Sequence, residues 1–337
     1  MEKTLSIIIP TYNMEKYLRR CLDSLSVSST PERLEVIVVN DGSKDSSLSI
    51  AREYEAKYPG IFRTIDKPNG NYGSCINRGL REATGKYVKI LDADDWFDTM
   101  ALEELLDVMS GIDVDLVVSD YMLVLDDDHM QRRGYGLPAR VEVPVSECFD
   151  IAGVGMFEMH AIAYRRENLL QMGYRQSEGI SYTDLEWATI PMSTVGRVFY
   201  FNKPVYQYFI GREGNTMSVL YTPKWLRQAL IVRKAMVESI GDGSRPVSAV
   251  EEYKCRLVEM RLRDMYLAAL MKGGLNDDAL REFDDYLRHK NKSLYDAMAD
   301  VTVHDRFKYR FVKAWRKNGR VSPVILSLYR MMMKVKR

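Results

Sequence analysis

Short apolar runs alternate with amphipathic segments along the first third of the chain. Residues 5–9, 34–39 and 87–91 are rich in β-branched and other apolar side chains. Runs of this length are typical of parallel strands that are covered on both faces. The segments between them, such as residues 17–25, place apolar residues at helical spacing instead. Strands and helices that alternate in this way predict a doubly wound α/β sheet.

Polar side chains follow each of these three strands at the point where the strand ends. In chain order the clusters are Thr11-Tyr12-Asn13, Asp41-Gly42-Ser43 and Asp92-Ala93-Asp94-Asp95. In an open α/β sheet the ligand binds in the crevice beyond the carboxyl ends of the strands. We therefore expect the three clusters to form one ligand site. Each cluster alone is also typical of a turn or a helix cap, and Asn13 is the expected N-cap of the first helix.

The acidic cluster suggests a metal site. Asp92 and Asp94 are two positions apart, so both can face one side of the strand end, where a divalent cation and substrate phosphates would meet. On this interpretation Tyr12 lies against a base, Asp41 accepts from a base N–H or a ribose hydroxyl, and Asp94 binds the metal. The alternative is an acidic turn that caps a helix beginning near Thr99.

Composition narrows the class of protein. Hydrophobic residues make up 46% and charged residues 28% of the chain, as in a folded globular protein. No Gly-x-Gly-x-x-Gly follows the first strand and no P-loop motif is present, which argues against dinucleotide-binding and P-loop proteins. The cysteines are far apart, so we expect reduced thiols. The apolar runs are too short for a signal peptide or a membrane helix, which favours a cytoplasmic protein.

Three motifs, in this order and spacing, resemble those of the family 2 glycosyltransferases of the GT-A fold: Ile8-Ile9-Pro10-Thr11-Tyr12-Asn13, Val39-Asn40-Asp41-Gly42-Ser43-Lys44-Asp45 and Leu91-Asp92-Ala93-Asp94-Asp95. The resemblance is strong over residues 4–125 and recognisable to about residue 218. It implies a nucleotide-sugar donor, usually a UDP-sugar, a Mn²⁺ or Mg²⁺ ion, and transfer with inversion at the anomeric carbon.

The resemblance also assigns roles to individual residues. Thr11, Tyr12 and Asp41 would hold the uridine, while Asp92 and Asp94 of the Asp-x-Asp motif would serve the ribose and the metal. The expected nucleotide-sugar ligands are Pro10, Thr11, Tyr12, Asn13, Asp41, Asn69, Asn77, Asp92, Ala93 and Asp95, with Asp94 on the metal.

The third loop departs from the family pattern. Many relatives carry an arginine where this chain has Ile76, which removes a cation that would help to neutralise a diphosphate. Lys67 or Arg78 are the possible replacements, although Arg78 would point elsewhere on the helix. Asn69 and Asn77 fit an ordering role in the loop better than a direct contact with the ligand. Backbone N–H groups of residues 72–74, at a helix N-terminus, offer another place for an anion.

Asp184 is the candidate catalytic base. Displacement of a nucleotide diphosphate by a sugar hydroxyl needs a base on the acceptor side. Asp184 matches the second acid of the family's Glu-Asp motif, whereas Thr183 stands in place of the first acid. The structural alternative is a capping box formed by Thr183 and Glu186, with Asp184 as a first-turn acid. Both can hold together, and Glu186 is better explained by structure.

Two further residues are possible contributors to the acceptor or diphosphate side. His160 lies on an expected strand, where a partly buried structural histidine is the alternative. Arg212 lies in a segment that resembles a loop able to close on the diphosphate, and a solvated arginine is equally compatible with its position.

The sequence divides the chain into three regions. Residues 1–220 form the expected GT-A domain, with a nucleotide-sugar part at 1–125 and an acceptor part at 126–220, where Asp126 to Asp128 are typical of a solvated hairpin turn. Residues 221–337 form a helical region. Residues 305–337 carry eleven Lys or Arg and one acid, which is a local charge of +10. Because the whole chain has a formal net charge of +1, residues 1–304 carry 1 − 10 = −9.

The basic tail contains aromatic residues such as Phe311 and Trp315, which favours an anionic membrane surface as its partner. Nucleic acid is not expected as a partner, and a tail that packs as a helical subdomain is the alternative. We expect a protein that is cytoplasmic and able to attach peripherally to the inner face of the cytoplasmic membrane.

The combined prediction is a metal-dependent inverting glycosyltransferase that uses a UDP-sugar and a hydroxyl of a glycan, polysaccharide or lipid-linked saccharide. A sugar-phosphate nucleotidyltransferase is the enzymatic alternative, but its Gly-rich loop after the first strand is absent. A non-catalytic sugar-binding or scaffold subunit is the third interpretation, suggested by Ile76 and Thr183.

Overall fold

The structure is a computed structural model that describes residues 3–26, 31–126, 128–149, 155–211, 222–243, 246–273, 278–302 and 309–334. The chain forms two compact units, Met1–Asn215 and Thr216–Arg337, each with its own core. The boundary expected from the sequence is residue 220. Arg212 lies outside the described residues, so its expected role stays a prediction.

The first unit is a mixed α/β structure. Its strands are β1 (Leu5–Thr11), β2 (Leu34–Asn40), β3 (Phe62–Asp66), β4 (Tyr87–Ile90), β5 (Trp96–Phe97), β6 (Leu116–Val124), β7 (Met130–Arg133), β8 (Glu142–Pro144), β9 (Ile162–Arg165) and β10 (Arg197–Phe209). Its helices are α1 (Leu18–Asp23), α2 (Ser47–Lys57), α3 (Asn71–Glu82), α4 (Thr99–Gly111), α5 (Val145–Phe149), α6 (Arg166–Gln171) and α7 (Asp184–Thr189), with short 3-10 segments at Met159–Ala161 and Ile190–Thr194.

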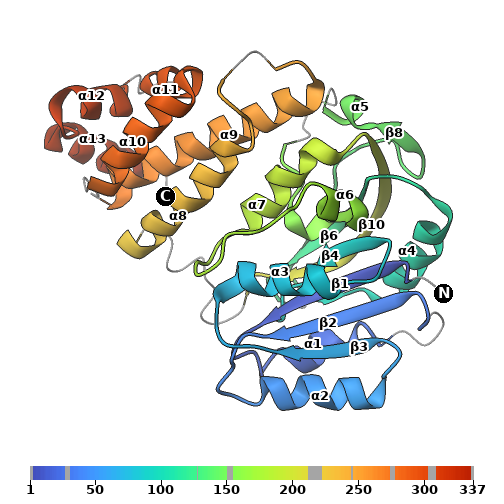
Figure 1. The fold of residues 1–337 in the computed structure, drawn as a ribbon. Helices are drawn as coiled ribbons and strands as arrows, with labels where there is room; N and C mark the ends of the chain where they lie inside the picture. Colours follow the sequence, from blue (N-terminus) through green and yellow to red (C-terminus); the bar gives the residue numbers. More distant parts are fainter. Residues whose placement is uncertain are drawn as a thin grey trace. The chain divides into compact units, whose positions relative to one another are not determined.

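All ten strands belong to one sheet, whose main path runs β3-β2-β1-β4-β9-β6-β10-β5. Strands β3, β2, β1 and β4 are parallel, whereas β9 runs antiparallel to both of its neighbours. Helices α2 and α3 lie on opposite sides of β1 to β3 (Figure 1). The expected doubly wound mixed sheet is confirmed.

Burial explains why the apolar runs became central strands. Every residue of β1, β2 and β4 is buried, because helices cover both faces of this part of the sheet. The hairpin expected at the acidic run is also present. Strands β6 and β7 pair as an antiparallel hairpin, and the exposed Asp126 side chain accepts from the backbone N–H groups of Asp128 and His129 in its turn.

The described elements of the second unit are helical. They are α8 (Pro223–Glu238), α9 (Ala249–Leu267) with its π-helical extension Ala268–Gly273, α10 (Asp278–Lys290), α11 (Lys292–Ala299), α12 (Phe311–Asn318) and α13 (Pro323–Lys334). None of the described helices is long and apolar enough to cross a membrane.

The basic tail forms part of the core of this second unit. Phe311 is 0% and Trp315 2% exposed, and the Trp315 ring packs near Tyr266. The Arg316 guanidinium pairs with the Asp284 carboxylate at 2.7 Å. The interpretation that Phe311 and Trp315 face a membrane is therefore wrong, because these rings fill the space between helices.

Candidate active site

The three polar clusters lie side by side at one edge of the sheet. Thr11, at the end of β1, pairs in register with Asn40 at the end of β2. The next residue, Asp41, donates its backbone N–H to the Thr11 carbonyl at 2.8 Å. On the other side of β1, the Leu91 N–H donates to the Ile8 carbonyl at 3.0 Å. The three polar clusters therefore lie together, as their positions at the strand ends predict.

Asp41 anchors the loop that enters α3. Its side chain is buried, pairs with the Lys67 ammonium, and accepts a hydrogen bond from the Gly70 N–H at 2.9 Å. The Asn69 amide donates to the Asp41 carbonyl at 2.9 Å. Asn69 therefore orders this loop, as expected, and Lys67 is committed to Asp41.

Tyr12 and Asn13 lie at the rim of the site. The Tyr12 side chain is 46% exposed, so its ring is accessible to a ligand. Asn13 was expected to cap the first helix, but α1 begins only at Leu18 with Tyr17 as its N-cap. Asn13 instead adopts a left-handed φ of 54°, and its side-chain oxygen accepts from the Lys44 N–H at 2.8 Å. The first and second clusters are thus joined through a turn.

The acidic turn does not cap the next helix. Asp98 takes that role, because its side chain accepts from the Ala101 N–H at 2.8 Å at the start of α4. Asp92 accepts instead from the Tyr72 hydroxyl at 2.7 Å. The capping alternative for residues 92–95 is therefore wrong, because Asp98 and not the acidic turn caps α4.

Asp95 ties the acidic turn to the end of β10. Its two carboxylate oxygens accept from the Tyr206 hydroxyl at 2.6 Å and from the Phe209 N–H at 2.7 Å. Burial, followed by the charges of Asp94 and Asp92, raises the pKa of Asp95 well above its usual value. Asp95 is thus a buried anchor of the turn.

Asp92, Asp95 and His160 form a cluster suited to a cation. One potential ligand atom from each residue lies within 4.8 Å of the others. Burial, and then the neighbouring Lys89 charge, lowers the pKa of His160 to about 3, which keeps the imidazole neutral as a metal ligand requires. Within the described part of the chain, His160 Nδ1 is buried without a hydrogen-bond partner. The donor set therefore fits a divalent metal.

Asp94 lies outside this cluster of three. Its backbone carbonyl accepts from the Arg20 guanidinium at 3.0 Å, and that guanidinium stacks 3.7 Å above the Trp96 ring. Burial lowers the pKa of Arg20, while the charges of Asp95 and Asp94 oppose the shift. The assignment of Asp94 as the metal ligand stays a prediction, and Arg20 is a cation near the turn that the sequence pattern does not reveal.

Asp184, the candidate base, lies in the same electrostatic neighbourhood as the acidic turn. Burial raises the pKa of the Tyr208 hydroxyl, and the charges of Asp95, Asp92, Asp184 and Asp94 raise it further, in that order. The pKa of Tyr72 is likewise raised well above its usual value by burial, then by Asp92, and also by Asp184. One pair of tyrosines thus experiences both carboxylate centres, which lie 90 positions apart in the chain.

The expected capping box at the start of α7 is absent. Thr183 is the N-cap, but its side chain makes no capping hydrogen bond. Its hydroxyl oxygen accepts from the Gln176 amide at 2.8 Å instead. Glu186 turns to the Ser177 N–H, at 2.7 Å, rather than to the N-cap backbone. The predicted capping box is absent because the Thr183 and Glu186 side chains bind Gln176 and Ser177 in the preceding loop instead. Glu186 still has the structural role that was expected.

Three contacts join the loop before Asp184 to Gly70, in the loop that Asp41 anchors, and to helix α3. The Gly179 N–H donates to the Gly70 carbonyl at 2.9 Å. A Cβ on Gly73 would lie 2.0 Å from the Ser177 carbonyl oxygen, so only glycine allows this approach. The Asn77 amide donates to the Gln176 carbonyl at 2.8 Å. Asn77 therefore has an ordering role, as expected, but it orders the loop before Asp184 rather than the third loop.

Comparisons with known proteins agree with this geometry. Residues 6–169 match the family model described as glycosyl transferase family 2. The chain contains a family 2 glycosyltransferase domain. It is 38% identical to the putative glycosyltransferase EpsH of Bacillus subtilis over 122 residues, which cover 36% of this chain and 35% of EpsH. The chain thus spans about a third of the length of that relative.

Solved structures show the same fold over most of the chain. S. aureus TarS 1-349, in complex with UDP-GlcNAc, is similar with a TM-score of 0.62 and 20% identity, covering 94% of this chain and 92% of that one. The mannosyltransferase PcManGT of Pyrobaculum calidifontis, in complex with GDP-Man and Mn²⁺, has a TM-score of 0.52 and 20% identity, covering 86% and 81%. The family and the GT-A fold expected from the sequence are confirmed.

The glycosyltransferase domain has no cation at the position of the missing arginine. Ile76 is fully buried in α3. Arg78, one of the two proposed replacements, pairs with Glu82 on the same helix at 3.0 Å. Lys67, the other, pairs with Asp41. Arg20 is a cation that the structure brings to the acidic turn instead.

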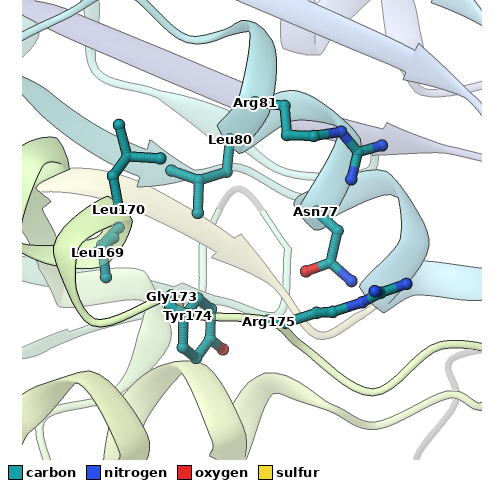
Figure 2. Close-up of a pocket in the computed structure, with 8 residues that line it drawn as sticks. All are labelled: Asn77, Leu80, Arg81, Leu169, Leu170, Gly173, Tyr174 and Arg175. Atoms are coloured by element: carbon teal, nitrogen blue, oxygen red, sulfur yellow. The ribbon is translucent and has the colours of Figure 1, made fainter.

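A cavity of about 210 Å³ lies between α3 and the segment that follows α6 (Figure 2). It is lined by Asn77, Leu80, Arg81, Leu169, Leu170, Gly173, Tyr174 and Arg175. Asn77 is the one expected donor ligand among these residues, and no acid of the turn at 92–95 contributes. This cavity is therefore distinct from the carboxylate site.

Sequence reasoning missed the residues that β10 and α3 bring to the site. Tyr206 and Tyr208 are two positions apart on β10, so both face the acidic turn. Their only local signal is aromatic alternation in a strand, which is equally typical of a core. The side chains of Tyr72 and Gln176 carried no signal, because neither belongs to a motif; only the backbone of residues 72–74 was expected to contribute.

Proposed function

We propose that this chain transfers a sugar from a UDP-sugar to a hydroxyl of an acceptor saccharide, with inversion at the anomeric carbon. The observation that carries the proposal is the shared neighbourhood of the turn at 92–95 and Asp184 around Tyr72 and Tyr208. A single displacement needs a leaving-group site and a base at opposite ends of one reacting centre, and two carboxylate centres around common side chains meet that need.

On the donor side, we assign the nucleotide to the part of the site formed by Thr11, Tyr12 and Asp41, of which Tyr12 lies at the exposed rim. The exposed Tyr12 ring can lie against the base, and Asp41 is held in place by the loop of Lys67 and Gly70. The UDP-GlcNAc complex of TarS and the GDP-Man complex of PcManGT support a nucleotide-sugar donor, with uracil favoured by the family resemblance.

On the leaving-group side, Asp92 and His160, with Asp94 as the predicted further ligand, would hold Mn²⁺ or Mg²⁺, which when bound neutralises charge on the departing diphosphate. Asp95, the third member of the cluster, would offer a carboxylate oxygen to the metal while the Tyr206 hydroxyl and the Phe209 N–H hold its side chain in place. An imidazole among the ligands favours Mn²⁺ over Mg²⁺, since Mg²⁺ prefers oxygen ligands. The Mn²⁺ in the PcManGT complex is consistent with this choice.

The proposed reaction is a single displacement at the anomeric carbon. The acceptor hydroxyl oxygen forms a bond to the anomeric carbon while the bond from that carbon to the β-phosphate oxygen breaks. The Asp184 carboxylate takes the hydroxyl proton, and UDP leaves with the electron pair of the broken bond. Because attack and departure occur on opposite faces, the anomeric configuration inverts. Glycans, polysaccharides and lipid-linked saccharides are the proposed acceptor classes.

We further propose that the second unit attaches the protein to an anionic membrane through α13, on the cytoplasmic side. Val324, Leu328 and Met331 are 67%, 42% and 58% exposed, and their spacing places them on one helix face. The net positive charge of residues 305–337 complements acidic lipids.

Vesicle sedimentation tests this attachment. Deletion of residues 305–337 would also remove the buried Phe311 and Trp315, so a point variant is the cleaner probe. Leu328→Glu should lose binding to vesicles that contain acidic phospholipid, while Met260→Glu, at another exposed apolar residue of the second unit, should keep it. Absence of wild-type binding, or equal binding by both variants, would contradict the proposal.

Two experiments test the transferase proposal itself. Calorimetry should show UDP binding that depends on Mn²⁺ and that Asp94→Ala abolishes. A panel of UDP-sugars should include at least one from which the chain releases UDP slowly in the presence of Mn²⁺. Failure to bind UDP under any condition would favour the scaffold alternative, which Ile76 and Thr183 raise. Pyrophosphate formation from UTP and a sugar phosphate would favour the nucleotidyltransferase alternative.

A further inference from the structure

We propose that Gln176 is a positioning residue that sets the direction of the Asp184 side chain, in the role that a side-chain helix cap would otherwise fill. The inference rests on the proposed function of Asp184 as the base and adds the residue that holds that base in place. Gln176 is 1% exposed and lies in the segment between α6 and α7.

The Gln176 carboxamide forms two hydrogen bonds with Thr183, the residue directly before Asp184. Its Nε2 donates to the Thr183 carbonyl oxygen at 2.9 Å and to the Thr183 hydroxyl oxygen at 2.8 Å. The Thr183 carbonyl belongs to the planar peptide unit that includes the Asp184 N and Cα atoms. Together with the helical φ of Asp184, the first residue of α7, the orientation of that carbonyl sets the direction in which the Asp184 side chain departs from the backbone.

The backbone at this point needs such support. Tyr182, one position before Thr183, has a φ of 64° although it is not glycine. A left-handed conformation at a bulky residue is strained and persists only where surrounding contacts determine it. Because the Thr183 side chain makes no capping bond, the two bonds from Gln176 supply part of that determination.

Gln176 is itself held from the donor side of the domain. Asn77 donates to the Gln176 carbonyl and accepts from the Gln176 N–H, both at 2.8 Å. The Tyr174 hydroxyl donates to the Gln176 side-chain oxygen at 3.2 Å. Asn77 extends from α3 towards the segment of Tyr174 and Arg175 (Figure 2). The helix whose Tyr72 contacts Asp92 is thus connected through Asn77 and Gln176 to Asp184.

Gln176→Leu removes both hydrogen bonds to Thr183 and keeps a similar side-chain volume. We expect kcat for UDP release, measured with the UDP-sugar that the panel identifies, to fall about 10- to 100-fold, because a misplacement of about 1 Å can cost a factor of that size. Mn²⁺-dependent UDP binding and the donor KM should stay within about twofold of wild type. Gln171→Leu, at an exposed glutamine on α6, is the matched control and should leave all three quantities unchanged.

Gln176→Glu gives a readout that a general loss of structure would not. A protonated carboxyl can donate to the Thr183 carbonyl, whereas an ionised one can only accept. The ratio of variant to wild-type kcat should therefore rise as the pH falls, with UDP binding constant over the same range. If Gln176→Leu does not fold, Thr183→Val, which removes only the hydroxyl contact, should still lower kcat at unchanged donor KM.

The outcomes separate this inference from the proposed function. An active wild type with unchanged kcat in Gln176→Leu overturns the positioning role alone. Equal losses of UDP binding and kcat overturn it too, because they would show that Gln176 supports the whole domain. A wild-type chain that neither binds UDP nor releases it from any UDP-sugar overturns the proposed function, and the inference with it.

Discussion

The Tyr206 hydroxyl joins the acidic turn to β10 by donating to Asp95 at 2.6 Å and accepting from the Asp92 N–H at 3.1 Å. The two residues that share the shorter bond are 111 positions apart in the chain. Burial and neighbouring charges raise the pKa of Asp95, which shows that its ionised form is unfavourable in this place. Loss of the Tyr206 hydroxyl would leave one buried Asp95 oxygen without its hydrogen-bond donor, which costs free energy of folding.

Tyr206→Phe should therefore destabilise the first unit by about 1–3 kcal/mol, since a buried acceptor loses its partner. It should also weaken Mn²⁺-dependent UDP binding, because the Asp92 backbone loses its acceptor. Denaturant unfolding and calorimetry check both effects. Tyr200→Phe, which removes a hydroxyl from the buried Asp120 elsewhere in the sheet, is the control and should affect stability alone. Unchanged UDP binding in Tyr206→Phe would contradict the role given to this bond.

Asp184→Asn should lower the rate of sugar transfer by about 10²- to 10⁴-fold, the usual contribution of a general base. Calorimetry should show unchanged affinity for UDP, because the proposed role of Asp184 is to take the proton of the acceptor hydroxyl and not to hold the nucleotide. Asp126→Asn, at an exposed carboxylate in the turn between β6 and β7, should be fully active. Transfer at the wild-type rate by Asp184→Asn would require another base.

Asp41→Asn should weaken UDP binding about tenfold or more and destabilise the loop into α3. The amide oxygen can still accept from the Gly70 N–H, but the Lys67 ammonium loses its charged partner in a largely buried place. Asp66→Asn, at the exposed end of the neighbouring strand β3, is the matched control for calorimetry. Equal effects of the two variants on UDP affinity would remove Asp41 from the donor site.

His160 should make the protein sensitive to acid. Since burial lowers the pKa of His160 to about 3, the unfolded chain binds a proton that the folded chain does not between about pH 6.5 and 3. Folding stability therefore falls as the pH drops through that window, by up to about 1.4 kcal/mol per pH unit. His160→Phe should lose less stability than wild type between pH 7 and 4.5 in denaturant unfolding.

The exposed His289 in α10 supplies the control for that comparison. His289→Phe should retain the acid sensitivity of the wild type. If His160→Phe and wild type lost stability in parallel, the acid sensitivity would belong to other groups.

Much of the fold could be predicted because it is encoded locally. The strands β1, β2 and β4 are short runs that are buried on both faces, and such runs are recognisable without knowledge of their partners. The polar clusters that follow them had to meet, since parallel strands end at the same edge of the sheet. For the same reason, the locations of Asp41 and Asp92 were recoverable from the sequence.

The contacts that give these residues their properties could not be predicted in the same way. A capping box at Thr183 was a sound local prediction, but it failed because Gln176 competes for the Thr183 hydroxyl. Tyr206 and Tyr208 reach the acidic turn from a strand more than a hundred positions later. Phe311 and Trp315 suit a membrane surface by residue type alone, because their helical partners are not visible in the sequence.

A crystal structure with UDP and Mn²⁺, with the metal placed by anomalous scattering, would decide whether the proposed site is correct. We expect Mn²⁺ at the acidic turn beside Asp92, the diphosphate next to it, and Asp184 facing the same space from the other end. Mn²⁺ or UDP bound away from this turn, or an Asp184 side chain that opens onto a different face of the domain, would contradict it.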